Sequence, residues 1–112
     1  MTPVEALWIP ACRSRGWLGD RNVPSPGISA VLRALADHGP TYGSAVARLA
    51  AQNQANVTAV WLPKLVRLGF VERGEEEAGL GHQGGGRPAV FWALTGPGWA
   101  LVRALAECEV AA

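Results

Sequence analysis

The fold is decided by residues 62–73, Leu-Pro-Lys-Leu-Val-Arg-Leu-Gly-Phe-Val-Glu-Arg, where a helical pattern changes into a strand pattern. Apolar residues of the preceding segment recur at helical spacing and predict one helix from about Ala55 to Leu68. Its core-facing positions are Val57, Trp61, Leu65 and Leu68, with Leu62 beside them. Gly69 favours the end of that helix. Residues 70–73 then predict a short strand.

Two further helices are predicted before this one. Ser25-Pro26 is typical of a helix start, and Gly39-Pro40 of a helix end. The apolar face of the first helix is Ile28, Val31, Leu32, Leu35 and Ala36. The second helix is expected to be capped by Thr41 and to end near Gln52, with Tyr42, Ala45, Val46, Leu49 and Ala50 on its apolar face. The short connection at Asn53-Gln54 joins the second helix to the helix 55–68, and two helices joined by so short a turn form a helix-turn-helix pattern.

A second strand and a last helix are predicted after residue 73. Residues 89–94 are rich in strand-forming side chains. With 70–73 they predict a β-hairpin whose long, glycine-rich tip spans 74–88. Thr95 is expected to cap a final helix with Leu101, Val102 and Leu105 on its apolar side. The predicted class is α+β, mostly α: a winged helix-turn-helix with three helices, a two-stranded β-wing and a C-terminal helix.

The first 27 residues differ from the rest in their frequent prolines and glycines. Thr2-Pro3-Val4-Glu5 is typical of a capping box with proline in the first turn. A short helix over about Pro3–Ile9, ended by Pro10, is expected. We interpret 1–27 as an N-terminal arm, a possible dimerisation element, and 28–112 as the winged-helix domain.

Composition sets limits on the class of protein. The chain has 112 residues and a formal net charge of +1, which predicts one domain without a strong basic signature. No run of about 20 apolar residues predicts a membrane span, and no signal peptide is apparent, so a cytoplasmic, nucleoid-associated location is expected. Cys12 and Cys108 are expected to be small buried residues, with an intersubunit disulfide or redox switch as the alternative.

Catalytic and metal-binding motifs are not found in the sequence. His38 and His82 have neither a carboxylate nor a cysteine partner at motif spacing. No glycine-rich loop follows a strand and opens a helix, so a phosphate-binding motif is not predicted either. We therefore expect a protein that is not an enzyme and has no cofactor or metal.

Three local motifs resemble the winged helix-turn-helix regulators of the MarR and PadR type. They are residues 62–72, Gly86-Arg87-Pro88 with Leu94-Thr95-Gly96-Pro97-Gly98 after the second strand, and Gly39-Pro40-Thr41-Tyr42-Gly43. The resemblance covers about residues 28–106 and implies that the helix 55–68 is a recognition helix. Pro63 departs from the pattern, because proline inside a helix costs roughly 3 kcal/mol and kinks it. The helix is expected to be bent there, to start later, or to offset the cost by core contacts.

The outward side of the predicted recognition helix suggests how it would read DNA. Gln54 and Asn56 can each make a paired contact with adenine, and Ala59 and Val60 can touch thymine methyl groups. Lys64, Arg67 and Arg48 are expected to reach phosphates. The alternative for Gln54 and Asn56 is turn and cap chemistry.

The hairpin tip is predicted to enter the minor groove through Arg87, where negative potential is greatest. The alternative is a solvated, flexible loop. Glu75-Glu76-Glu77 would repel phosphate, so these residues are expected to point away from DNA or to face a protein.

A homodimer is predicted because tryptophans lie near both chain ends. Its expected interface is Val4, Leu7, Trp8, Trp99, Leu101 and Leu105. The alternative is that these tryptophans complete the core of a single chain.

The leading hypothesis is a sequence-specific, double-stranded DNA-binding protein, a homodimeric transcriptional repressor. One alternative is a DNA-organising protein for plasmid or phage partition or replication control. Another is a winged helix used for protein contact, which the near-neutral charge favours. The sequence does not indicate whether a small-molecule effector binds.

Overall fold

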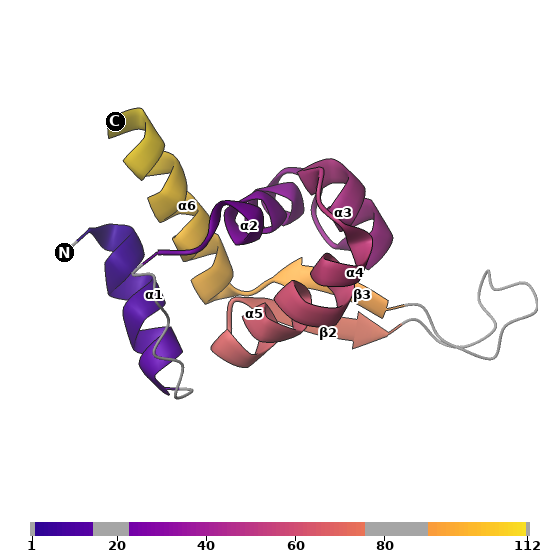
Figure 1. Cartoon of the computed structure of the whole chain (residues 1–112). Helices are drawn as coiled ribbons and strands as arrows, with labels where there is room; N and C mark the ends of the chain where they lie inside the picture. The colour runs from indigo at the N-terminus through magenta and orange to yellow at the C-terminus, as the bar shows by residue number, and fades with distance from the viewer. Residues whose placement is uncertain (1, 15–22, 76–89, 112) are drawn as a thin grey trace, which may run out of the picture.

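A computed structural model describes residues 2–14, 23–75 and 90–111 of the chain. In chain order its elements are α1 (Pro3–Ser14), α2 (Pro26–His38), β1 (Thr41–Tyr42), α3 (Gly43–Ala50), α4 (Gln54–Asn56), η1 (Val57–Trp61), α5 (Leu62–Leu68), β2 (Val71–Glu75), β3 (Val90–Leu94) and α6 (Gly96–Ala111). Helices α1 and α6 lie at one end of the molecule, and the β2–β3 hairpin extends toward the opposite end (Figure 1).

The sheet has three strands, in the order β1-β3-β2, and both pairings are antiparallel. The predicted hairpin is confirmed, with Val71 opposite Leu94 and Glu75 opposite Val90. The strand β1 was not predicted: Thr41 pairs with Trp92, and the side chain of Thr41 is buried. Its two residues are too few to show the alternation that identifies a strand from sequence.

The ends of α2 and of α6 follow the capping chemistry expected from the sequence. The Ser25 side chain accepts a hydrogen bond from the Ile28 amide at 3.3 Å. Thr95 Oγ1 accepts one from the Gly98 amide at 3.1 Å. Gly39 ends α2 with a φ of +89°, a conformation in which a β-carbon would be strained.

The N-terminal helix α1 is longer than predicted. Thr2 and Glu5 form the expected capping box, in which the Glu5 amide donates to Thr2 Oγ1 and the Thr2 amide donates to Glu5 Oε1, both at 3.1 Å. The prediction that Pro10 ends the helix was wrong, because α1 continues to Ser14. Trp8 and Cys12, on either side of Pro10, are both buried. We attribute the continuation of α1 to the burial of these two side chains, which offsets the cost of a proline inside the helix.

The helix α3 begins later than predicted and turns a different face inward. Thr41 lies in β1 instead of capping the helix, and Tyr42 and Leu49, placed on the apolar face, are exposed. Val46 is buried as predicted, and the other inward positions are Gly43 and Ala47. The pairing of Thr41 and Tyr42 with β3 moves the first helical residue to Gly43, which shifts the face.

One core joins α1, α2, α3, η1, α5 and α6 to the sheet. Its fully buried members include Val31, Leu32, Leu62, Leu65 and Leu101. Trp8 of α1 stacks on Phe70, with ring centroids 5.8 Å apart. Residues 3–14 therefore pack into the same core as the rest of the chain. None of the helices in the described part of the chain has the length and apolar character of a membrane span.

Candidate DNA interface

The segment predicted as one helix is formed by α4, η1 and α5 in direct succession, and we call residues 54–68 the composite helix. Asn53 caps its start, since its side-chain Oδ1 accepts a hydrogen bond from the Asn56 amide at 3.2 Å. Gly69, with a φ of +87°, ends it as predicted. The capping role therefore belongs to Asn53, and the side chains of Gln54 and Asn56 are exposed.

A π-helical turn accommodates Pro63 within the composite helix. In this turn the Leu62 amide donates to the Val57 carbonyl, five residues back instead of four. Pro63 follows at the second residue of α5, directly after the π-turn, where the changed hydrogen-bond spacing leaves room for a residue that has no amide hydrogen to donate. The π-turn contains one residue more than a regular helical turn, and this allows the helix to continue through Pro63.

The π-turn also changes which residues face the core. Val57 and Leu62, five residues apart, are both fully buried, whereas Trp61 is half-buried. A regular helix would place Val57, Trp61 and Leu65 in line, which was the prediction for this face. The predicted order of burial was wrong: Leu62, expected only beside this line, is fully buried, and Trp61, expected within it, is half-buried.

The opposite edge of the composite helix is open to solvent. Gln54, Asn56, Ala59, Val60 and Arg67 are exposed, and Pro63 and Lys64 are half-buried. Val60 is 52% exposed, so this edge carries apolar as well as polar surface. The predicted contact residues of this segment are therefore open to solvent, in full or in part.

The composite helix crosses α3 at a close contact. A β-carbon on Gly43 would lie 2.5 Å from Thr58 Cγ2 and 3.3 Å from Trp92 Nε1. Thr58 is held in place by its hydroxyl, which donates to the Gln54 carbonyl at 2.8 Å. Three residues, Ala51 to Asn53, connect the two helices, and Ala51 turns the chain with a φ of +55°. Arg48, near the end of α3, is exposed.

Solved structures with this architecture were found at low sequence identity. Bordetella bronchiseptica BpsR, whose DNA binding is regulated by 6-hydroxynicotinic acid, has a TM-score of 0.63 at 22% identity, over 91% of this chain and 71% of that chain. A MarR family transcription regulator has a TM-score of 0.62 at 18% identity, over 96% and 61%. RV1404 from Mycobacterium tuberculosis has a TM-score of 0.59 at 20% identity, over 97% and 67%. The chain has a MarR-like winged-helix fold.

The chain spans about 60–70% of the length of these proteins. No family model and no curated protein matches its sequence. In this winged helix, α2, α3 and the composite helix form the helix-turn-helix part, so the composite helix takes the place of the recognition helix. The strands β2 and β3 form the base of the wing. Arg87, His82 and most of the predicted wing tip lie outside the described residues.

The residues predicted for a dimer interface separate into two groups. Val4, Trp8 and Leu101 are buried in the winged helix itself, at 1%, 4% and 0% exposure, so the core of a single chain uses them. Trp99 is 46% exposed, and Leu7 and Leu105 are half-buried. These last three remain available at the end of the molecule formed by α1 and α6.

The cysteines differ in their surroundings. Cys12 is buried, as predicted, whereas Cys108 is exposed, so the prediction of burial was wrong for Cys108. The side chain of Cys108 lies beyond Leu105, where α6 has left the core. Burial raises the pKa of the Cys12 thiol, and the nearby charge of Lys64 opposes that rise.

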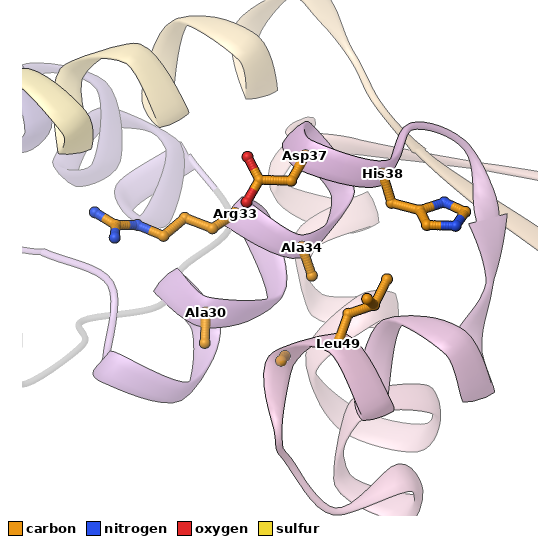
Figure 2. A pocket seen from close by; sticks show the side chains of 7 residues that line it. Ala30, Arg33, Ala34, Asp37, His38 and Leu49 are labelled. Atoms are coloured by element: carbon orange, nitrogen blue, oxygen red, sulfur yellow. The ribbon is translucent and has the colours of Figure 1, made fainter.

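A cavity of about 350 Å³ lies between α2 and α3 (Figure 2). Its lining residues are Ala30, Arg33, Ala34, Asp37, His38, Leu49 and Ala50. None of them belongs to the outward edge of the recognition helix. The sequence did not indicate this cavity, because its spacing placed Leu49 on the core face. Among the described residues, no group of His, Cys, Asp and Glu is arranged to hold a metal ion.

Proposed function

We propose that this winged helix is a sequence-specific regulator that binds double-stranded DNA with the recognition helix in the major groove. The observation that carries the proposal is the outward edge from Gln54 to Arg67. This edge is exposed, has amide and apolar side chains at its start, and has basic side chains at its end. The major groove admits a helix and displays a distinct pattern for each base pair.

Each part of the edge has a partner on the duplex. Gln54 and Asn56 would pair with the N6 and N7 atoms of adenine, and each good paired contact discriminates by about 1–3 kcal/mol. Ala59 and Val60 would meet thymine methyl groups. Lys64 and Arg67, with Arg48 on α3, would contact phosphates and fix the position of the helix. The expected half-site therefore contains A·T pairs.

The wing is the second proposed contact. The base of the hairpin extends away from α1 and α6 (Figure 1), as a minor-groove contact on one side of the helix-turn-helix requires. Arg87 would supply the positive charge there. This part of the proposal rests on the sequence, because Arg87 lies outside the described residues.

We further propose that the protein acts as a homodimer through the end formed by α1 and α6. Exposed Trp99, with half-buried Leu7 and Leu105, supplies apolar surface there. A two-fold axis would place the recognition helices about 34–36 Å apart, to match successive turns of the duplex. Sedimentation of Trp99→Glu should give a monomer where the wild type gives a dimer. Val23→Glu, at another exposed apolar residue, is the control and should leave the dimer intact.

The proposal is tested by gel retardation with random genomic DNA at low salt, followed by a salt titration on selected fragments. A dimer that neutralises 6–10 phosphates should lose affinity by about 10³–10⁵ between 50 and 200 mM salt. No retardation at low salt would favour the alternative, a winged helix used for protein contact. A flat salt titration would also contradict the proposal.

A repressor is the regulatory role that we favour, since a bound dimer would block access to the duplex. The alternative is a DNA-organising protein for partition or replication control. Genome-wide selection of bound fragments separates the two. One operator near the protein's own gene supports the repressor, whereas many adjacent sites with cooperative binding support the organising role.

The cavity between α2 and α3 is the place where we propose that a small-molecule effector binds. Its volume of about 350 Å³ falls within the roughly 300–1,000 Å³ typical of ligand pockets. It lies between two helices of the helix-turn-helix part, so an occupant could alter how α3 supports the recognition helix. A suitable probe is 6-hydroxynicotinic acid, the regulator of BpsR. A rise in melting temperature that is lost in Ala30→Trp, at a half-buried lining residue, would support this site, and no rise at millimolar probe would contradict this choice of ligand.

A further inference from the structure

The recognition helix carries its charges only at its far end. Between Arg48 and Lys64 the sequence has no charged residue. Contacts that identify G·C pairs most strongly use Arg or Lys on guanine and Glu or Asp on cytosine. None of these side chains is found in residues 49–63, so the part of the edge nearest the bases is neutral.

The polar groups of this neutral stretch are few. Thr58 already donates its hydroxyl to the Gln54 carbonyl at 2.8 Å, and Asn53 is occupied as the helix cap. Gln54 and Asn56 remain at the start of the helix. The next turn presents the methyl groups of Ala59 and Val60 to solvent.

The π-turn is what presents Val60 in this way. Residues 57–61 contain the extra residue of the turn, and Val57 and Leu62 anchor it to the core on both sides. Val60 lies between these anchors and is 52% exposed. Its position is therefore fixed by buried neighbours, while about half of its own surface faces solvent.

We propose that Val60 is a specificity-determining residue that reads the C5-methyl group of a pyrimidine, so that its site accepts 5-methylcytosine as well as thymine. The inference rests on the proposed placement of the recognition helix in the major groove. Both bases present this methyl group in that groove, whereas uracil and unmethylated cytosine do not. An apolar side chain gains by burying a methyl group and has no polar atom with which to separate the two bases.

The test combines substitutions in the protein with substitutions in the DNA and measures the binding affinity of each combination. The duplex is first obtained by selection from random DNA. Each thymine of the half-site is replaced in turn by deoxyuridine, which removes only the methyl group. One position should lose affinity about fourfold, the effect of about one buried CH2 group. With Val60→Ala the same replacement should have little or no effect. Val23→Ala, which shortens an exposed valine outside the recognition helix, should keep the full discrimination.

A second experiment tests whether the methyl group of 5-methylcytosine is read as well as that of thymine. At the sensitive position, a 5-methylcytosine·guanine pair should bind about fourfold more tightly than a cytosine·guanine pair. The proposal is overturned if no deoxyuridine changes the affinity, if the change persists in Val60→Ala, or if cytosine methylation has no effect. A protein that retards no duplex at all would instead contradict the proposed function itself.

Discussion

The indole ring of Trp61 lies directly against the α-carbon of Gly27. A β-carbon at residue 27 would be 2.5 Å from Trp61 Cη2 and 2.9 Å from Cζ3. This contact joins the π-turn of the recognition helix to the first turn of α2. Because an aromatic ring is rigid, a larger residue at 27 would have to move one of the two helices.

We therefore expect Gly27→Ala to destabilise the protein by about 1–3 kcal/mol, the usual cost of overpacking. Urea unfolding measures the change. Gly96→Ala is the matched control, since no more distant part of the described chain lies within 4 Å of a β-carbon there, and it should be neutral or slightly stabilising. Equal destabilisation of the two variants would show that the contact with Trp61 does not limit residue 27.

Thr95 joins the end of the recognition helix to the start of α6. Its hydroxyl donates to the Gly69 carbonyl at 2.6 Å and accepts from the Gly98 amide at 3.1 Å. Thr95→Val keeps the shape of the side chain but removes both hydrogen bonds, so we expect the unfolding free energy to fall by about 1–2 kcal/mol. Thr95→Ser keeps the hydroxyl and should recover most of that stability. A valine variant as stable as the wild type would contradict this role.

The two thiols should react at very different rates. Exposed Cys108 should be labelled rapidly by a thiol-specific disulfide reagent, and buried Cys12 only after unfolding. Burial raises the pKa of Cys12 above its ordinary value of 9.0, so the folded state holds this proton more tightly than the unfolded state. Its contribution to stability is therefore present below pH 9 and is lost as the pH rises through the folded pKa.

Labelling of Cys108→Ser checks the assignment, because this variant should show no fast phase. Unfolding free energies of the wild type and of Cys12→Ala between pH 8 and 11 check the linkage. The wild type should lose more stability than the variant over this range. Rapid labelling of Cys12 in the folded protein would contradict its burial.

Lys64 and Arg67 are expected to act on phosphates and not on bases. Each substitution by glutamine should weaken binding to all sequences by a similar factor. It should also reduce the slope of log K against log salt by about 0.9 for each phosphate that the variant no longer neutralises, or roughly twice that in a dimer. Arg103→Gln, at an exposed position of α6, should leave the slope unchanged. A change in sequence preference with an unchanged slope would instead assign Lys64 or Arg67 to a base.

Most of the fold could be predicted because local chemistry and apolar spacing agree along much of the chain. The capping residues Thr2, Ser25 and Thr95 and the helix-ending glycines Gly39 and Gly69 all act as their residue types indicate. These features depend on neighbours within three or four residues, which the sequence displays directly.

The errors come from tertiary context. The pairing of Thr41 with Trp92 depends on a residue 51 positions away, so β1 was not predicted, and Tyr42 and Leu49 were wrongly placed on the core face of α3. The burial of Trp8 against Phe70 keeps α1 helical through Pro10.

The outward edge of the recognition helix was predicted more fully than its core face. Pro63 showed that the helix could not be regular, but the sequence did not indicate a π-turn as the solution. That turn moved Leu62 to the centre of the core and left Asn56, Val60 and Arg67 on the outward edge. The extra residue rotates the side chains that follow it around the helix axis. A prediction of exposure survives this rotation more easily than a prediction of which side chains pack in the core.

The central claim is that the exposed edge from Gln54 to Arg67 faces the duplex. Amide chemical-shift mapping of the labelled protein, titrated with a selected duplex, tests it most directly. We predict that the largest changes fall on Gln54, Asn56, Ala59, Val60 and Arg67, with small changes around Arg33 and Asp37 on α2. Large changes confined to other surfaces, with residues 54–67 unaffected at saturating DNA, would contradict the claim.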